Sequence, residues 1–144
     1  MLICLNYATI SENSPLLEQT EKLASDFSEQ DLVLVDRLAS GNGFSMLTGP
    51  LSTLYGKQAV YFFNPEDAAK IDRTRFQNIY LVIPEESWKL YKESSLASQL
   101  VFEKDYTIST EIFDTDAQKK DKIEKVSLLQ LKSITTYGKI FRLK

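Results

Sequence analysis

The chain contains no histidine among its 144 residues and only one cysteine. Without an imidazole it cannot use a histidine general base, a histidine zinc site or a Ser-His-Asp triad. The single thiol, Cys4, cannot form an internal disulfide, and its position in the apolar opening Leu2–Leu5 favours a buried structural role over a nucleophilic one. These absences exclude several large enzyme classes.

Long hydrophobic runs and a basic charge excess are also missing. No segment approaches the ~18 consecutive apolar residues of a membrane span, and Met1–Leu5 is too short and lacks the basic start of a signal peptide. The chain as given is therefore expected to be soluble. Its formal net charge of −3 argues against a nucleic-acid partner, because such proteins neutralise several phosphates with a basic face.

What is present is the composition of an ordinary globular protein, with 43% apolar and 26% charged residues. A chain of this length predicts a single α/β domain over residues 1–144. Within it, residues 1–98 are expected to form a body of βαβ type. Residues 99–144 are expected to form a β-rich C-terminal edge.

In the body, short apolar runs alternate with segments of helical periodicity. Ser14 and Pro15 announce a helix, and one face of it is expected to carry Leu16, Thr20, Leu23, Ala24 and Phe27. Further helices are predicted over residues 44–55, with Gly56 as a C-terminal cap, over 64–76, with Asn64 as the capping residue, and from Glu85, where Trp88, Tyr91 and Ser95 share a face. Strands are predicted over residues 2–7, 32–35, 59–63 and 79–83.

After residue 100 the pattern changes to alternation of period two. Phe102, Tyr106, Ile108 and Ile112 alternate with polar residues, which predicts a strand with one solvated face. A polar loop over residues 114–122 and closing strands over 126–131 and 139–143 follow. The sequence therefore predicts a three-layer, Rossmann-like α/β fold whose mostly parallel sheet has antiparallel C-terminal edge strands.

The loop after the apolar run Leu32–Val35 is the place to expect a ligand, because open α/β sheets bind ligands beyond the carboxyl ends of their strands. Its candidate ligand-binding residues are Asp36, Arg37, Ser40, Gly41, Asn42, Gly43 and Phe44. The glycines can take positive φ, and Phe44 can cover a sugar or a base. The structural alternative is a tight turn in which Asp36 caps backbone amides or pairs with Arg37.

Other polar and aromatic groups give weaker signals. Met46 stands where a dinucleotide fingerprint needs a third small residue, and no Gly-Lys-Ser/Thr of a phosphate loop is present. The acids Asp36, Asp67 and Asp72 have no spacing that supports a metal site or a glycosidase pair, so no metal, cofactor or catalytic residue is predicted. The aromatic residues allow two interpretations: a platform for a sugar or, more commonly, part of the core. They are Tyr55, Tyr61, Phe62, Phe63, Tyr80 and Trp88.

Four segments carry a resemblance to a known family. They are Asp31-Leu-Val-Leu-Val-Asp-Arg-x-Ala-Ser-Gly-Asn-Gly-Phe44, Gly49-Pro-Leu51, Tyr55-Gly-Lys-x-Ala-Val-Tyr-Phe-Phe-Asn-Pro65 and Gly138-Lys-Ile-Phe-Arg-Leu143. Together they resemble the soluble C-terminal tail of bacterial polytopic membrane proteins related to lipid-linked-sugar glycosyltransferases of the dolichyl-phosphate-mannose type. The family's catalytic acids lie in an extracytoplasmic loop between membrane spans, and no position here matches them.

The resemblance implies a location on the extracytoplasmic face of a membrane, beside a membrane-embedded portion of the same or a neighbouring protein, and contact with a glycan. Two hypotheses follow. The first is a non-catalytic accessory or interaction domain that contacts a sugar or a partner through the loop after residues 32–35. The second is a small stand-alone enzyme that binds a nucleotide or nucleotide-sugar through the same loop.

Overall fold

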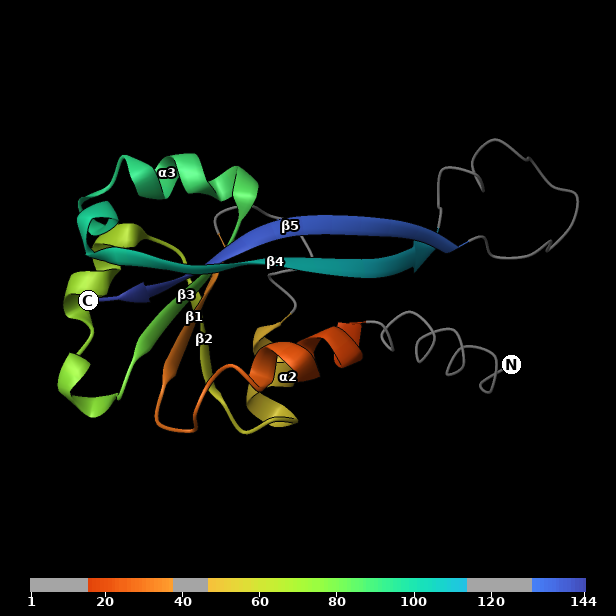
Figure 1. The fold of residues 1–144 in the computed structure, drawn as a ribbon, viewed down its shortest axis with the longest axis horizontal. Helices are drawn as coiled ribbons and strands as arrows, with labels where there is room; N and C mark the ends of the chain where they lie inside the picture. Colours follow the sequence, from red (N-terminus) through yellow and green to blue (C-terminus); the bar gives the residue numbers. More distant parts are fainter. Residues whose placement is uncertain (1–15, 38–46, 114–130) are drawn as a thin grey trace, which may run out of the picture.

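The computed structural model describes residues 16–37, 47–113 and 131–144. In these residues five strands form one mixed sheet in the order β2-β1-β3-β5-β4 (Figure 1). The strands are β1 (Leu32–Asp36), β2 (Gln58–Phe62), β3 (Ile79–Pro84), β4 (Leu100–Phe113) and β5 (Leu131–Leu143). The predicted α/β class, with a parallel side and an antiparallel C-terminal edge, is confirmed, whereas the predicted strand over residues 2–7 and loop over 114–122 lie outside the described residues.

Strand β1 lies in the middle of the parallel side. Leu32 is in register with Gln58 of β2 on one side and with Ile79 of β3 on the other. All five residues of β1 are buried, which explains why its sequence is a continuous apolar run rather than an alternating one. The predicted buried strand over residues 32–35 is therefore confirmed.

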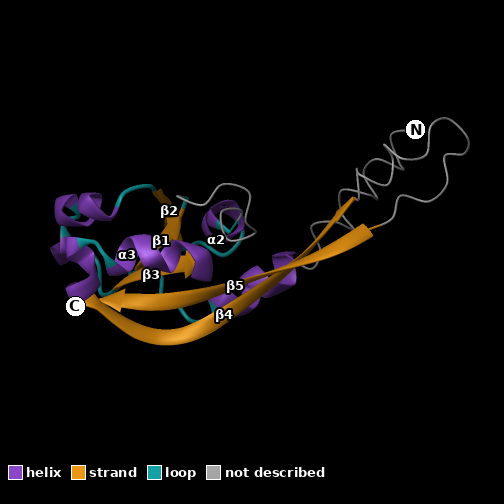
Figure 2. Cartoon of the chain, turned by 90° about the horizontal axis from the view of Figure 1, so that it is seen from above, coloured by secondary structure: helices purple, strands orange, loops and turns teal. Residues whose placement is uncertain are grey.

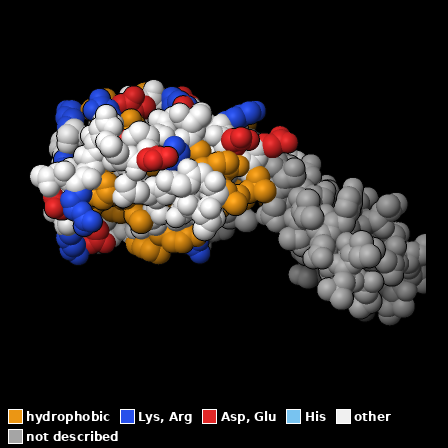
Figure 3. Space-filling view, turned by 90° about the horizontal axis from the view of Figure 1, so that it is seen from below, with side chains coloured by type: hydrophobic (Ala, Val, Ile, Leu, Met, Phe, Trp, Pro, Cys, Tyr) orange, Lys and Arg blue, Asp and Glu red, His pale blue; other side chains and the backbone are white. Residues whose placement is uncertain are grey.

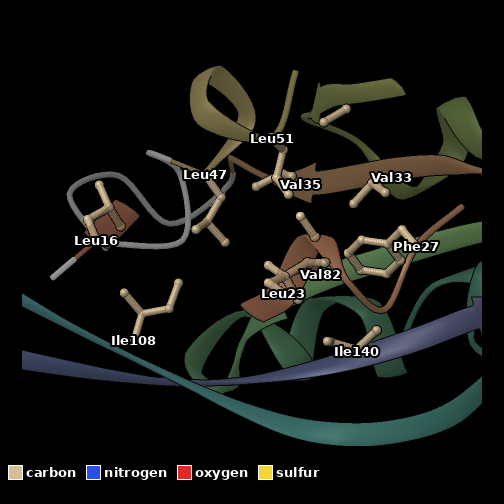
Figure 4. Packing of buried hydrophobic residues seen from close by; sticks show 12 residues of the cluster. Leu16, Leu23, Phe27, Val33, Val35, Leu47, Leu51, Val82, Ile108 and Ile140 are labelled. Atoms are coloured by element: carbon tan, nitrogen blue, oxygen red, sulfur yellow. The ribbon is translucent and has the colours of Figure 1, made fainter. Parts of the chain in front are cut away.

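Helical segments cover both faces of the sheet. Residues 16–24 are helical and, with α2 (Thr48–Thr53), they cover one face, where Leu23 and Phe27 point toward Val33 and Val82 (Figure 4). The predicted helical face is confirmed, because its members are all buried: Leu16, Thr20, Leu23, Ala24 and Phe27. Because successive strand residues point to opposite faces, Leu34 and Leu81 pack on the other side.

That second face is covered by short segments. They are the 3-10 helices η2 (Pro65–Lys70), η3 (Arg73–Arg75), η4 (Glu85–Ser87) and η5 (Ser95–Gln99) together with α3 (Trp88–Lys92). The prediction of one helix over residues 64–76 is wrong in its extent. Asn64 does cap the segment by accepting from the Glu66 N–H at 3.1 Å, but Ile71 is extended, and the Asp72 side chain captures the Thr74 amide to begin a new turn.

Helix α2 is shorter than the predicted 44–55 helix. It begins at Thr48, so Pro50 falls in its first turn, where the missing N–H costs no hydrogen bond. Gly56 follows its end with a φ of +63°, a conformation that glycine adopts without strain, as its predicted capping role requires. Residues 44–46 lie outside the described residues.

Strands β4 and β5 form a long two-stranded ribbon that reaches past the other strands (Figure 2). Within β5 only Gly138–Arg142 pairs with β3, and the rest of β5 pairs with β4 alone. The prediction of separate closing strands is wrong: residues 139–143 are the end of one strand that begins at Leu131. Residues 126–130 lie outside the described residues.

A β-bulge interrupts the alternation of β4 that the sequence predicts. The register between β4 and β5 shifts between Phe102 and Lys104, and an extra residue in one strand reverses the face of everything after it. Phe102 therefore contacts Phe141 on the face of α3, whereas Ile108 is buried with Leu16 on the opposite face. The predicted alternation is confirmed as a strand, but the prediction that its apolar residues share one face of the sheet is wrong.

The outer edge of β4 is partly covered by the helical segment over residues 16–24. The Gln19 side-chain amide donates to the Ser109 carbonyl at 2.6 Å and accepts from the Ser109 N–H at 2.6 Å, as a neighbouring strand would. The Tyr106 hydroxyl donates to the Gln19 carbonyl, and Lys104 pairs with Asp26. At Ser109 the outer edge of β4 therefore has its backbone N–H and carbonyl bonded within the chain.

Candidate functional site at the strand ends

The candidate site lies where β1 ends. Asp36 is the last residue of β1 and is in register with Phe62 of β2, and Arg37 extends the ladder by donating its N–H to the Phe62 carbonyl at 2.9 Å. Consecutive residues of a strand point to opposite faces of its sheet. Asp36 therefore points to the face covered by α3, and Arg37 to the face covered by α2.

Asp36 is fully buried, at 0% exposure. Its Oδ2 accepts from the Ser87 hydroxyl at 2.8 Å, and its Oδ1 accepts from the Tyr91 hydroxyl at 2.6 Å. Burial is the main cause, and the Asp36 carboxyl the second, of a pKa of Tyr91 that lies far above its ordinary value. The Tyr91 hydroxyl therefore stays protonated and donates its hydrogen bond to Asp36 at any physiological pH. We name the Asp36–Ser87–Tyr91 group the anchor, because it ties η4 and α3 to the end of β1.

Arg37 has a different environment. It is exposed, and its Cζ lies 5.0 Å from the centre of the Tyr61 ring. The Tyr61 and Phe63 rings are 6.3 Å apart and are 42% and 58% exposed. We name Arg37, Tyr61 and Phe63 the aromatic edge, because they lie at the C-terminal end of β2, the outermost strand of the parallel side.

The exposed large hydrophobic side chains gather near this edge. Of the eight such side chains in the described residues, four come from residues 54–63: Leu54, Val60, Tyr61 and Phe63. The other four come from α3, β4 and β5, and a view of the molecule from below shows hydrophobic patches that are separated mainly by uncharged surface (Figure 3). Val60 points to the opposite face of β2 from Tyr61, so the local cluster consists of the Tyr61 and Phe63 rings. Two adjacent exposed rings are more informative than single exposed apolar residues, which every surface carries.

The structure separates the two predicted site residues that it describes. The expectation that Asp36 caps backbone amides or pairs with Arg37 is wrong, because Ser87 and Tyr91 occupy both oxygens of its carboxyl. The other predicted site residues lie outside the described residues: Ser40, Gly41, Asn42, Gly43 and Phe44.

Sequence reasoning missed Ser87 and Tyr91. Both follow β3, the parallel neighbour of β1, and stand four residues apart, which places them on one side of a helical turn. An acid at the end of a buried strand needs donors, and hydroxyls at this spacing after the adjacent strand are the signal that could have identified them.

The aromatic residues divide between the core and the surface. The core interpretation is confirmed for Phe62, and the structure finds Tyr55, Tyr80 and Trp88 partly buried against the two core clusters. It is wrong for Tyr61 and Phe63, because β2 is an edge strand and only part of its surface is covered.

The remaining candidate acids belong to surface turns. Asp67 pairs with Lys70 at 2.6 Å, and hydrogen bonds from Thr74 lower the pKa of Asp72. In residues 16–37, 47–113 and 131–144 the structure brings together no group of three or more His, Cys, Asp or Glu side chains suited to a metal ion. The two acids thus cap and pair locally.

Comparison with protein-family models, curated proteins and solved structures finds no significant match to this chain. In the described part of the chain, no helix is both long enough and apolar enough to cross a bilayer. The case for a function therefore rests on the geometry at the strand ends.

Proposed function

We propose that this chain is a non-catalytic accessory domain of a membrane glycosyltransferase-like protein and that it contacts a sugar through the aromatic edge. The observation that carries the proposal is the exposure of Tyr61 and Phe63 beside Arg37 at the end of the parallel sheet. The resemblance of residues 31–65 and 138–143 to the tails of such proteins supports the same context, on the extracytoplasmic face of the membrane. The family itself and the three-layer, Rossmann-like description of the body are part of this proposal.

The chemistry of the edge suits a carbohydrate. A sugar ring has an apolar face of C–H groups that packs on an aromatic ring, and its hydroxyls need hydrogen-bonding partners at the periphery. Tyr61 supplies both a ring and a hydroxyl, Phe63 supplies a second ring, and Arg37 supplies N–H donors. Tyr61 lies in β2, Phe63 directly follows β2, and Arg37 directly follows the adjacent strand β1 and is bonded to Phe62 through its N–H, so the sheet positions all three.

We propose a non-catalytic role because Asp36, the acid at the strand ends, is buried and bonded within the protein. The Asp36 carboxyl accepts two hydroxyl hydrogen bonds inside the protein and presents no exposed atom to a substrate. A general acid or base has to reach the proton that it transfers. Asp36 is placed to stabilise the fold instead.

Binding should be measured with neutral mannan and with the uronic-acid polymer polygalacturonate, by affinity electrophoresis and calorimetry on the full chain. We expect at least one polymer to bind and Tyr61→Ala with Phe63→Ala to weaken that binding at least tenfold. Tyr137→Ala is the matched control, because Tyr137 is a more exposed tyrosine, at 62%, on β5, which β1 and β3 separate from β2. Equal binding by the double variant and the wild type would remove the edge from the proposal.

A nucleotide or nucleotide-sugar binder is the second candidate, and one observation favours it. From β1 the chain proceeds to β2 on one side and to β3 on the other, so the end of β1 is the switch point where α/β sheets bind nucleotides. A thermal-shift panel of nucleotides and nucleotide-sugars tests it, because a ligand at about 100 times its Kd stabilises a protein by ~2.7 kcal/mol. A flat response across the panel would count against this candidate.

A further inference from the structure

We infer that the sugar bound at the aromatic edge is acidic, and that a carboxylate or phosphate on it pairs with the Arg37 guanidinium while a ring of the same ligand packs on Tyr61 or Phe63. This inference rests on the proposed function and adds the ligand class to it. It also assigns Arg37 a role that the aromatic side chains cannot fill.

The first observation is that Arg37 is uncommitted. Its guanidinium forms no ion pair and no side-chain hydrogen bond with any other residue in the described part of the chain. Two other arginines are engaged: Arg73 donates to the Lys144 carbonyl and to Gln99, and Arg142 donates to Glu103 at 2.8 Å. Arg37 thus keeps its N–H donors available at the surface.

The second observation is the contact with Tyr61. The Arg37 Cζ lies 5.0 Å from the centre of the Tyr61 ring, and this cation–π contact attracts the cation to the ring without a hydrogen-bond acceptor. The ring therefore positions the cation without consuming its donors. A carboxylate or phosphate can receive two parallel N–H groups from such a guanidinium, which is the geometry that arginine offers and lysine does not.

The third observation concerns the neighbouring acid. Asp36 is adjacent in sequence, yet its side chain lies on the other face of the sheet with both oxygens bonded to hydroxyls. Asp36 therefore forms no ion pair with the Arg37 guanidinium, and no other carboxylate in the described residues pairs with Arg37. Among residues 16–37, 47–113 and 131–144, an anionic ligand therefore meets no carboxylate that already holds this cation.

The overall charge makes the inference specific. The chain carries a formal net charge of −3, so general electrostatics oppose the binding of a polyanion. Attraction has to come from a local cation next to a surface that packs on a sugar. In the described residues the aromatic edge combines these two features.

The test uses three polymers on the full chain: polygalacturonate, a phosphorylated mannan and neutral mannan. We expect one or both acidic polymers to bind at least tenfold more tightly than neutral mannan, and that affinity to fall as the salt concentration is raised from about 50 to 500 mM. The two acidic arms distinguish a carboxylate from a phosphate. If neutral mannan binds as tightly as the two acidic polymers, the inference is overturned, whereas the proposed function is not.

Variants of the cation complete the test. Arg37→Gln is expected to weaken binding of the acidic polymer at least tenfold and to leave any binding of neutral mannan unchanged, and Arg37→Lys is expected to restore part of the loss. The matched control is Arg75→Gln, because Arg75 is also exposed but precedes β3, at the opposite end of the strands. An equal loss for both glutamine variants would overturn the inference by indicating general attraction. If no polymer binds, the proposed function itself fails.

Discussion

Two neighbouring residues at the end of β1 have opposite surroundings. Asp36 is buried and bonded on both oxygens by the anchor, whereas Arg37, one residue later, lies exposed over Tyr61. The difference arises from the alternation of a strand, which sends one side chain under α3 and the next to the open edge. It teaches that position at a strand end does not by itself make a residue part of a binding site.

The two outer edges of the sheet show the same contrast. The Gln19 amide covers the β4 edge at Ser109, and Asp26 pairs with Lys104 beside it. At the β2 edge Tyr61 and Phe63 are left exposed. Exposed apolar patches often mark contact sites, and the proposed ligand contact would account for this one.

The largest effect on stability is expected from the anchor. Asp36→Ala removes the acceptor of two buried hydroxyls, each of which costs ~1–3 kcal/mol when left unsatisfied, so the free energy of unfolding should fall by about 2–5 kcal/mol. Urea unfolding followed by circular dichroism measures it. The control Asp105→Ala removes a surface ion pair with Lys139 and should cost less than about 1 kcal/mol. Similar losses for both variants would mean that the anchor stabilises the fold no more than a surface ion pair does.

The next effect is a loss of stability at high pH. Burial raises the pKa of Tyr106 to about 12, and burial together with Asp36 raises that of Tyr91 further. A folded-state pKa above the unfolded one gives stability that is complete below the unfolded pKa, near 10, and is lost as the pH rises through the folded one. Above pH 10 the buried Tyr91 should remove about 1.4 kcal/mol per pH unit, and the half-exposed Tyr106 should remove less, because solvent screens it. Unfolding measured at pH 9, 10 and 11 tests this slope.

Tyr91→Phe sharpens that test. At neutral pH it should cost about 1 kcal/mol, because the Asp36 carboxyl loses one of its two donors. Above pH 10 its stability should decline less steeply than that of the wild type, by about 1.4 kcal/mol per pH unit. An identical alkaline slope in the two proteins would mean that Tyr91 ionises as easily in the folded state as in the unfolded chain.

A smaller effect is expected at the covered edge. Gln19→Ala should lower the free energy of unfolding by about 1–2 kcal/mol, because the Ser109 N–H and carbonyl lose their partner. Thermal and urea unfolding measure the loss, and light scattering measures any association of the freed edge. Glu18→Ala, at the adjacent exposed position, is the control and should change stability by no more than about 0.5 kcal/mol.

The smallest effect on stability is expected at the aromatic edge. Tyr61→Ala and Phe63→Ala remove side chains that are about half exposed and lie outside the buried core, so each should change the free energy of unfolding by about 0.5 kcal/mol. The comparison with the anchor breaks if either variant costs as much as Asp36→Ala, since the edge would then hold the fold together.

The local elements could largely be predicted from the residues themselves. The buried run of β1, the apolar face of residues 16–24 and the cap at Asn64 each depend on contacts near in sequence or on periodicity. The alternation of β4 was also predictable, but the bulge after Phe102 was not, because it appears only in the register with β5. Strand order likewise determined that β2 is an edge and that Tyr61 is exposed.

By itself, therefore, the sequence determined where strands and helical turns form, the apolar core-facing positions, and the absence of imidazole chemistry. Only the tertiary structure decided the use of the strand-end residues. Asp36 became an anchor because η4 brings Ser87 and α3 brings Tyr91 to it, from 51 and 55 residues away along the chain. Arg37 remained open because it faces the other side of the sheet, and whether a side chain is buried depends on which distant element covers that side.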